Sequence, residues 1–131
     1  MGYRFEFDAA NRILVGRFEG RLTEEAAVEF YKVFEKHIVA SGASTYICDL
    51  SAVNDFAMGS DFLRGLARRE PIIPNATRPR FLVAPTTAGY GLMRMFQIVA
   101  EPSRPHLQVA RTVDEALSAL GVRSPHLEPI S

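Results

Sequence analysis

Two segments of the sequence gather polar side chains that could contact a ligand or a partner. They cover residues 49–60 and 85–91, and each follows a short apolar run. Because loops at the carboxyl ends of parallel strands meet at one edge of an α/β sheet, we expect both segments to form one surface. The side chains expected there are Asp49, Ser51, Asn54, Asp55, Ser60, Thr86, Thr87 and Tyr90. Turn and capping residues of these types would instead hydrogen-bond their own backbone.

Arg94 extends this predicted surface. Gly89 and Gly91 lie at the start of a predicted helix, where free backbone N–H groups favour an anion. Arg94 lies about one turn beyond Tyr90, so both side chains share a helical face. The segment lacks the Lys-Ser/Thr pair of a phosphate-binding loop and the third glycine of a dinucleotide fingerprint. Arg94 is therefore expected either to bind an anion or to remain a solvated surface residue.

The sequence offers no convergent set of catalytic side chains. Cys48 lies inside the apolar run of residues 46–48, which predicts a buried and inert thiol. His37, His106 and His126 are far apart, and none has metal-ligand spacing with another histidine or with Cys48. We therefore expect no enzyme, no catalytic residue, no metal site and no cofactor.

Length and charge narrow the class of protein. The chain has 131 residues, of which 47% are hydrophobic and 23% charged, as in a single globular domain. Fifteen basic residues balance 15 acidic ones, which argues against a dedicated nucleic-acid binder. No window approaches the roughly 18 apolar residues of a membrane span. The amino terminus also lacks the apolar stretch of a signal peptide, so we expect a cytoplasmic protein.

Periodicity predicts strands and helices in alternation. Residues 3–8 and 12–19 should form an antiparallel hairpin, because the link between them is short. A helix should follow the N-cap Thr23 and end at Gly42. Further strands are predicted at residues 44–50, 80–84 and 106–110, and further helices at residues 60–69 and 90–100. A last helix should start at Thr112, with Glu115 completing a capping box, and end at Gly121.

The element order β-β-α-β-α-β-α-β-α predicts an α/β fold. We expect a mixed sheet of parallel strands with one antiparallel amino-terminal strand and helices packed on it. Residues 1–121 should form a single domain, and residues 122–131 a loosely ordered tail. If the first strand lies at a sheet edge, its aromatic residues Tyr3, Phe5 and Phe7 would invite pairing with a second copy, as in a homodimer.

The element order and the segment YICDLSAVNDFAMGSDFLRGL, residues 46–66, resemble the STAS family, the SpoIIAA-like anti-sigma-factor antagonists. Asp49-Leu50-Ser51 matches the strand end of that family, and residues 58–61 fall at its phosphorylation loop. The usual Asp-Ser-Ser-Gly is Gly59-Ser60-Asp61-Phe62 here, so a one-residue slip places either Ser60 or Asp61 at the phosphorylated position. The segments YGLMRMF and TVDEALSAL are similar to a bacterial subgroup of STAS-like proteins.

The resemblance implies a SpoIIAA-like fold and regulation through protein–protein contacts. It also implies, in some members, binding of nucleotides or lipid-like ligands. We therefore expect a non-catalytic interaction module with an unidentified protein partner. The alternative is a sensor or carrier of a small or lipid-like ligand, with an apolar pocket formed by aromatic and methionine side chains. Its predicted lining is Phe56, Met58, Tyr90, Met93 and Met95.

Overall fold

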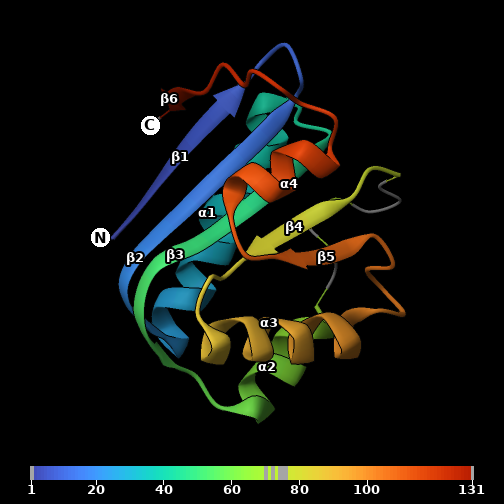
Figure 1. Cartoon of the computed structure of the whole chain (residues 1–131). Helices are drawn as coiled ribbons and strands as arrows, with labels where there is room; N and C mark the ends of the chain where they lie inside the picture. The colour runs from blue at the N-terminus through green and yellow to red at the C-terminus, as the bar shows by residue number, and fades with distance from the viewer. Residues whose placement is uncertain (1, 70, 72, 74–76, 131) are drawn as a thin grey trace.

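The chain folds into a six-stranded mixed sheet with helices on both faces (Figure 1). The structure, a computed structural model, describes residues 2–69, 71, 73 and 77–130, so Met1 and Ser131 at the ends of the predicted domain and tail lie outside the described residues. The elements are β1 (Tyr3–Asp8), β2 (Ile13–Thr23), α1 (Glu24–Ser41), β3 (Thr45–Ala57), α2 (Ser60–Ala67), β4 (Arg80–Val83), α3 (Thr87–Ala100), β5 (Leu107–Ala110), α4 (Val113–Ala119) and β6 (Glu128–Ile130).

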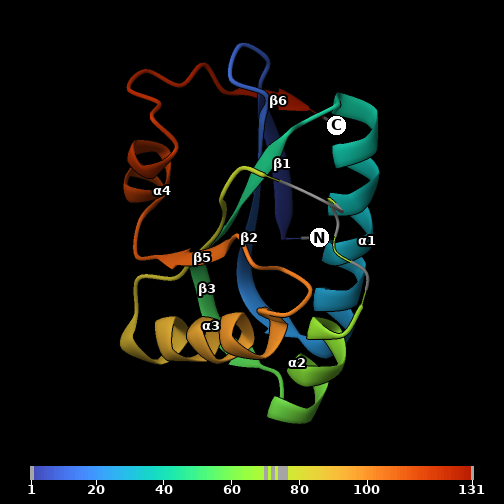
Figure 2. The same cartoon turned by 90° about the vertical axis from the view of Figure 1, so that its right-hand side faces the viewer.

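The sheet order is β5-β4-β3-β2-β1-β6. Strands β2 to β5 pair in parallel, and β1 pairs antiparallel with β2. Figure 2 shows α1 and α4 on opposite sides of the sheet, with α2 and α3 gathered at one end. The predicted α/β class, the antiparallel first strand and the order of the first nine elements are therefore confirmed.

Helix α1 forms as its sequence signals predict. The Thr23 hydroxyl accepts a hydrogen bond from the Ala26 N–H at 3.1 Å and caps the first turn. Gly42 ends the helix in the left-handed region, at φ 69°, and its N–H donates to the Ile38 carbonyl at 3.1 Å. The buried face of α1 packs the rings of Phe30 and Phe34 against β1 and β2.

Two hydrophobic cores lie on the two faces of the sheet. The larger core joins the sheet to α1, α2 and α3, and the smaller one joins it to α4. The smaller core contains Ile13, Val15 and Ile47 but stops short of Arg17 and Asp49, the next residues on the same face of β2 and β3. One end of this face is therefore polar and is not part of the core that α4 completes.

Strand β3 is nearly twice as long as the sequence indicates, because it runs to Ala57. The prediction of a loop directly after residue 50 was wrong. Strand β2 also continues to Thr23, and the two strands stay paired through two register shifts up to Thr23 opposite Ala57. Polar residues such as Asn54 look like loop residues in the sequence, but here they lie exposed on a two-stranded ribbon while Val53 is buried. Figure 1 shows this ribbon curving toward α2 and α3.

The carboxyl-terminal tail contributes a strand that the sequence analysis did not predict. Strand β6 pairs antiparallel with β1, with Ile130 opposite Phe5. The β1 edge at Phe5–Phe7 is therefore covered, and β1 is not an edge strand there. The segment is too short and too rich in proline to show a period-two pattern. Its position comes instead from tertiary contacts, including the packing of Val122 and Leu127 against the smaller core.

The buried carboxylate of Asp8 fastens the β1–β2 turn and the tail. It accepts hydrogen bonds from the Asn11 N–H at 3.0 Å, the Asn11 Nδ2 at 2.8 Å and the His126 N–H at 3.2 Å. Burial alone raises the pKa of Asp8, but these bonds outweigh burial and hold the pKa below its ordinary value. The ionised form therefore stabilises the fold.

We expect Asp8→Asn to lower the free energy of unfolding by about 1 to 2 kcal/mol at pH 7, because the amide nitrogen cannot accept these bonds. Since the pKa of Asp8 is lowered on folding, its contribution is present above the unfolded pKa and is lost as pH falls through the folded pKa. Urea unfolding of both proteins should show the difference shrinking below about pH 4. A difference that stayed constant down to pH 2.5 would contradict this assignment.

Candidate functional site

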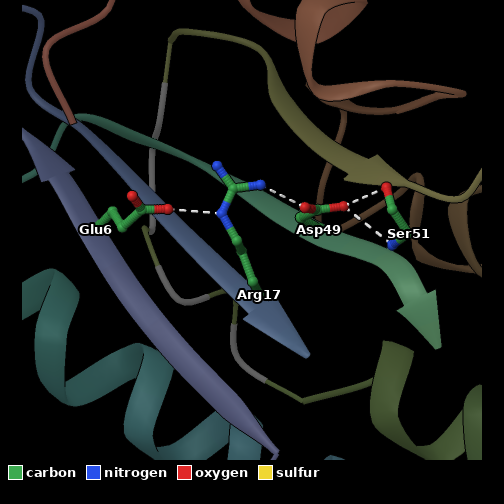
Figure 3. Close-up of polar contacts among 4 residues, drawn as sticks. All are labelled: Glu6, Arg17, Asp49 and Ser51. Carbon is green, nitrogen blue, oxygen red and sulfur yellow. Dashed lines mark hydrogen bonds and ion pairs between the residues drawn. The ribbon is translucent and has the colours of Figure 1, made fainter. Parts of the chain in front are cut away.

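Four residues form a continuous network at the polar end of the sheet face that carries the smaller core (Figure 3). Arg17 on β2 lies between Glu6 on β1 and Asp49 on β3. Its Nε donates to Glu6 Oε1 at 2.6 Å, and its Nη1 donates to Asp49 Oδ2 at 2.6 Å. The second oxygen of Asp49 accepts bonds from the Ser51 N–H at 3.0 Å and the Ser51 hydroxyl at 2.5 Å. The network therefore joins three neighbouring strands.

The charged groups of this network remain ionised although they are largely buried. The side chain of Asp49 is 8% exposed, against 22% for Arg17. Burial by itself lowers the pKa of Arg17, but the hydrogen bonds and charges of Glu6 and Asp49 outweigh burial and raise it. Arg17 thus stays cationic between two carboxylates. Asp49 and Ser51, which the sequence assigned to a contact surface, have their polar atoms committed to one another and to Arg17.

The two-stranded ribbon beyond this network carries the next predicted residues, Asn54, Asp55 and Phe56. Beyond Asp49, β3 pairs with β2 and no longer with β4 among the described residues. Asn54 and Asp55 are exposed, and Asp55 accepts a hydrogen bond from Arg21 Nε at 3.0 Å across the ribbon. Phe56 packs against the start of α3, where a Cβ on Gly89 would lie 2.9 Å from the Phe56 ring. The ribbon is thereby anchored to α3.

The start of α2 carries the two residues at the predicted phosphorylation position. Ser60 is the first residue of α2, and both Ser60 and Asp61 are exposed. Asp61 accepts a hydrogen bond from Arg64 Nη1 at 3.0 Å, one turn further along the helix. The N-cap is Gly59, whose N–H donates to Glu24 Oε2 at 3.1 Å. The carboxylate from α1 thus ties the start of α2 in place.

At the second predicted segment, α3 begins three residues earlier than predicted. The hydroxyl of Thr86 accepts the Gly89 N–H at 3.0 Å and caps the helix, so capping explains this residue. Thr87 is exposed in the first turn. The guanidinium of Arg111 lies 4.2 Å from the centre of the Tyr90 ring, a cation–π contact.

Arg94 is exposed on α3 and donates to Gln97 Oε1 at 2.5 Å. Gln97 in turn donates to the Leu107 carbonyl at 2.8 Å. The predicted contact residues thus fall into separate groups: Asp49 with Ser51, Phe56 with the cap of α3, and Ser60 with Asp61. The contacts among them do not join them into one cluster.

An apolar cavity of about 100 Å³ lies within the larger core, between the sheet and helices α1, α2 and α3. Of the five residues predicted to line an apolar pocket, Met58 and Met93 line this cavity. Phe56, Tyr90 and Met95 are not among its lining residues. Phe56 and Tyr90 are instead engaged at the start of α3.

Besides Asp8, sequence reasoning missed the charged residues Glu6, Arg17 and Arg104, which also organise the structure. Glu6 and Arg17 belong to the network, and a charged Arg17 after the apolar residues 13–15 of a strand was the available signal. Arg104 is only 3% exposed, and it donates to the Ala67 carbonyl at 2.5 Å and to the Tyr31 hydroxyl at 3.2 Å. No sequence pattern marks Arg104, because its partners lie 37 and 73 positions away.

Within the described residues, no three His, Cys, Asp or Glu side chains are grouped as a metal ion would require. No helix in the described part of the chain is long and apolar enough to cross a membrane. Comparison with known proteins finds no family model that matches the chain and no curated protein that matches it.

Proposed function

We propose that the chain is a cytoplasmic, non-catalytic, STAS-like regulatory module that binds a protein partner through the start of α2. We define the α2 surface as Ser60, Asp61, Arg64 and Arg68, all of which are exposed. The observation that carries the proposal is that the Ser60 hydroxyl is exposed and forms no hydrogen bond with the described residues. Its position at the start of a helix, directly after β3, is the one that the resemblance to the STAS family assigns to the phosphorylated residue.

Helix capping does not account for Ser60. Serine is favoured at N-cap positions because its oxygen accepts a backbone N–H of the first turn. Thr23, Thr86 and Thr112 do this for α1, α3 and α4. In α2 the N-cap is Gly59, without a side-chain bond, and Ser60 lies one residue too late for capping. An external role for its hydroxyl is therefore the better explanation.

The chemistry of the α2 surface suits a charge-dependent switch. A phosphate on Ser60 would add about 1.5 to 2 negative charges in the first turn, where the helix dipole favours them. Asp61 already supplies a carboxylate at the neighbouring position, so it could act as a built-in negative charge. Arg64 follows on the same helix, and Arg68 is its C-cap residue. A partner with complementary charges would thus bind with an affinity that depends on the charge of the first turn.

The rigid support of α2 strengthens the proposal. The start of α2 follows a paired strand rather than a free loop, and Phe56 and Glu24 anchor that connection to α3 and α1. A surface held in one conformation loses less entropy when a partner binds. The α2 surface is therefore preorganised for binding.

Asp61→Arg tests this function, with Asp114→Arg as the matched control. Both aspartates are exposed first-turn residues, in α2 and α4, so each change removes a similar helix-dipole interaction. Tagged proteins are expressed at equal levels in the cells of origin, crosslinked, captured and quantified by mass spectrometry. A partner captured by the wild type and by Asp114→Arg should fall at least about tenfold with Asp61→Arg, or 1.4 kcal/mol in affinity.

Equal capture of that partner by Asp61→Arg would exclude the α2 surface. The absence of any specific crosslinked partner with the wild type would contradict the interaction function itself.

A further inference from the structure

We propose that the apolar cavity beneath α2 is a binding site for a small, uncharged, apolar molecule about the size of one aromatic ring. This inference goes beyond the proposed docking function, because it concerns the buried side of α2 rather than the α2 surface. It rests on the elements that converge on the cavity, on its lining and on its volume.

Elements from most of the chain contribute side chains to the walls of the cavity. Tyr46 and Cys48 on β3 and Leu82 on β4 contribute from the sheet. Phe30 from α1, Leu63 from α2 and Met93 from α3 complete the walls. Three helices and the sheet therefore meet around one space.

The lining of the cavity disfavours a charged ligand. Apart from Tyr31, Tyr46 and Arg104, all the lining residues are apolar or carry a thiol. The Tyr31 hydroxyl and the Arg104 guanidinium already bond to each other, and Arg104 also bonds to the Ala67 carbonyl. Burial, the largest cause in each case, raises the pKa of Cys48 and of Tyr46 to about 12, so both are neutral at pH 7. A charged ligand would lose its hydration here, and Arg104, the cation of the lining, already donates to the Tyr31 hydroxyl and to the Ala67 and Arg69 carbonyls.

The volume fixes the size of the ligand. Protein interiors are close-packed, and voids larger than a water molecule are few in one domain. A space of about 100 Å³ lined by apolar groups offers a water molecule few polar partners. Dry cavities of roughly 150 Å³ bind benzene. Because the present space is smaller but opens toward the surface, a single ring is the largest occupant that matches it.

The same lining offers a route of entry. Met58 and Leu66 line the cavity but are only partly buried, so the space reaches toward the surface between β3 and α2. Methionine side chains are flexible enough to reorient around an entering molecule. The Met58 side chain therefore adjusts to the molecule that enters.

Toluene is the probe, and benzoate is its charged counterpart. We expect saturating toluene to raise the midpoint of thermal unfolding by about 2 °C or more, and benzoate to leave it unchanged. Ala27→Leu places a larger side chain into the cavity from α1 and should abolish the toluene shift. Ala40→Leu makes the same substitution at an exposed position of α1 and should keep the shift.

A second readout needs no substitution. With methionine methyl groups labelled with ¹³C, toluene should shift the signals of Met58 and Met93 in the NMR spectrum but not that of Met95, which does not line the cavity. Should Ala27→Leu fail to fold, Cys48→Ala, which enlarges the cavity, should retain the thermal shift. The proposal is overturned if toluene gives no thermal shift with the wild type, if Ala27→Leu responds like Ala40→Leu, or if Met95 moves while Met58 and Met93 do not.

Discussion

Gly16→Ala is expected to lower the free energy of unfolding by about 3 kcal/mol. Gly16 lies in the middle of β2 on the face covered by α1. A Cβ there would overlap the ring of Phe34 and would lie 2.7 Å from the ring of Phe5, closer than carbon atoms can approach. Both rings belong to a cluster with Phe30, with ring centres 5.2 to 5.6 Å apart, so neither can move freely.

Urea unfolding of Gly16→Ala, Phe34→Leu and the double variant measures this effect. Because leucine vacates the space that the new methyl group needs, the double variant should be at least about 1 kcal/mol more stable than the sum of the single effects predicts. Gly65→Ala is the control, since nothing lies within 4 Å of its Cβ position on α2. It should gain about 0.5 to 1 kcal/mol from helix propensity. Strictly additive effects would show that β2 or α1 moves away instead.

Arg17→Ala is expected to lower the free energy of unfolding by about 2 kcal/mol. The change leaves the carboxylate of Asp49, which is 8% exposed, without its cation and also frees Glu6. Removing one partner of a fully buried pair costs about 3 to 5 kcal/mol, and the smaller value reflects the partial exposure of Arg17. Arg17→Lys should retain only part of the stability, because an ammonium group lacks the planar fork that reaches both carboxylates.

Arg21→Ala provides a matched control on the same strand. Arg21 pairs with Asp55 at 3.0 Å, but its side chain is 67% exposed. Water and salt screen such a pair, so its loss should change stability by no more than about 0.5 kcal/mol. Equal effects of Arg17→Ala and Arg21→Ala in urea unfolding would mean that the network does not hold the three strands together.

Local signals predicted the helices well, because they act between residues close in sequence. The N-caps Thr23 and Thr112 and the stop at Gly42 were all predictable in this way. The extension of β3 was not, because it depends on two register shifts in its pairing with β2 that no local pattern specifies. Polar residues that face water from a ribbon have the same composition as a loop.

The candidate site was predictable only in part for a related reason. The exposure of Ser60 and Asp61 followed from the position of one helix start. The network around Arg17 depends instead on the alignment of three strands, and the cavity on the packing of three helices against the sheet. Such features arise from contacts between distant parts of the chain, which propensity and spacing do not encode.

The short strand β6 also determines how this sheet meets other molecules. An uncovered strand with exposed N–H and C=O groups is a template on which further chains can add, and this is how many proteins aggregate. Here the outermost strand has three residues, with Pro129 at its centre. Proline has no N–H to donate, and a three-residue strand offers little length for pairing. On the β1 side, the sheet therefore ends in a segment that resists extension. This protects the aromatic strand β1, which pairs with β6, from self-assembly.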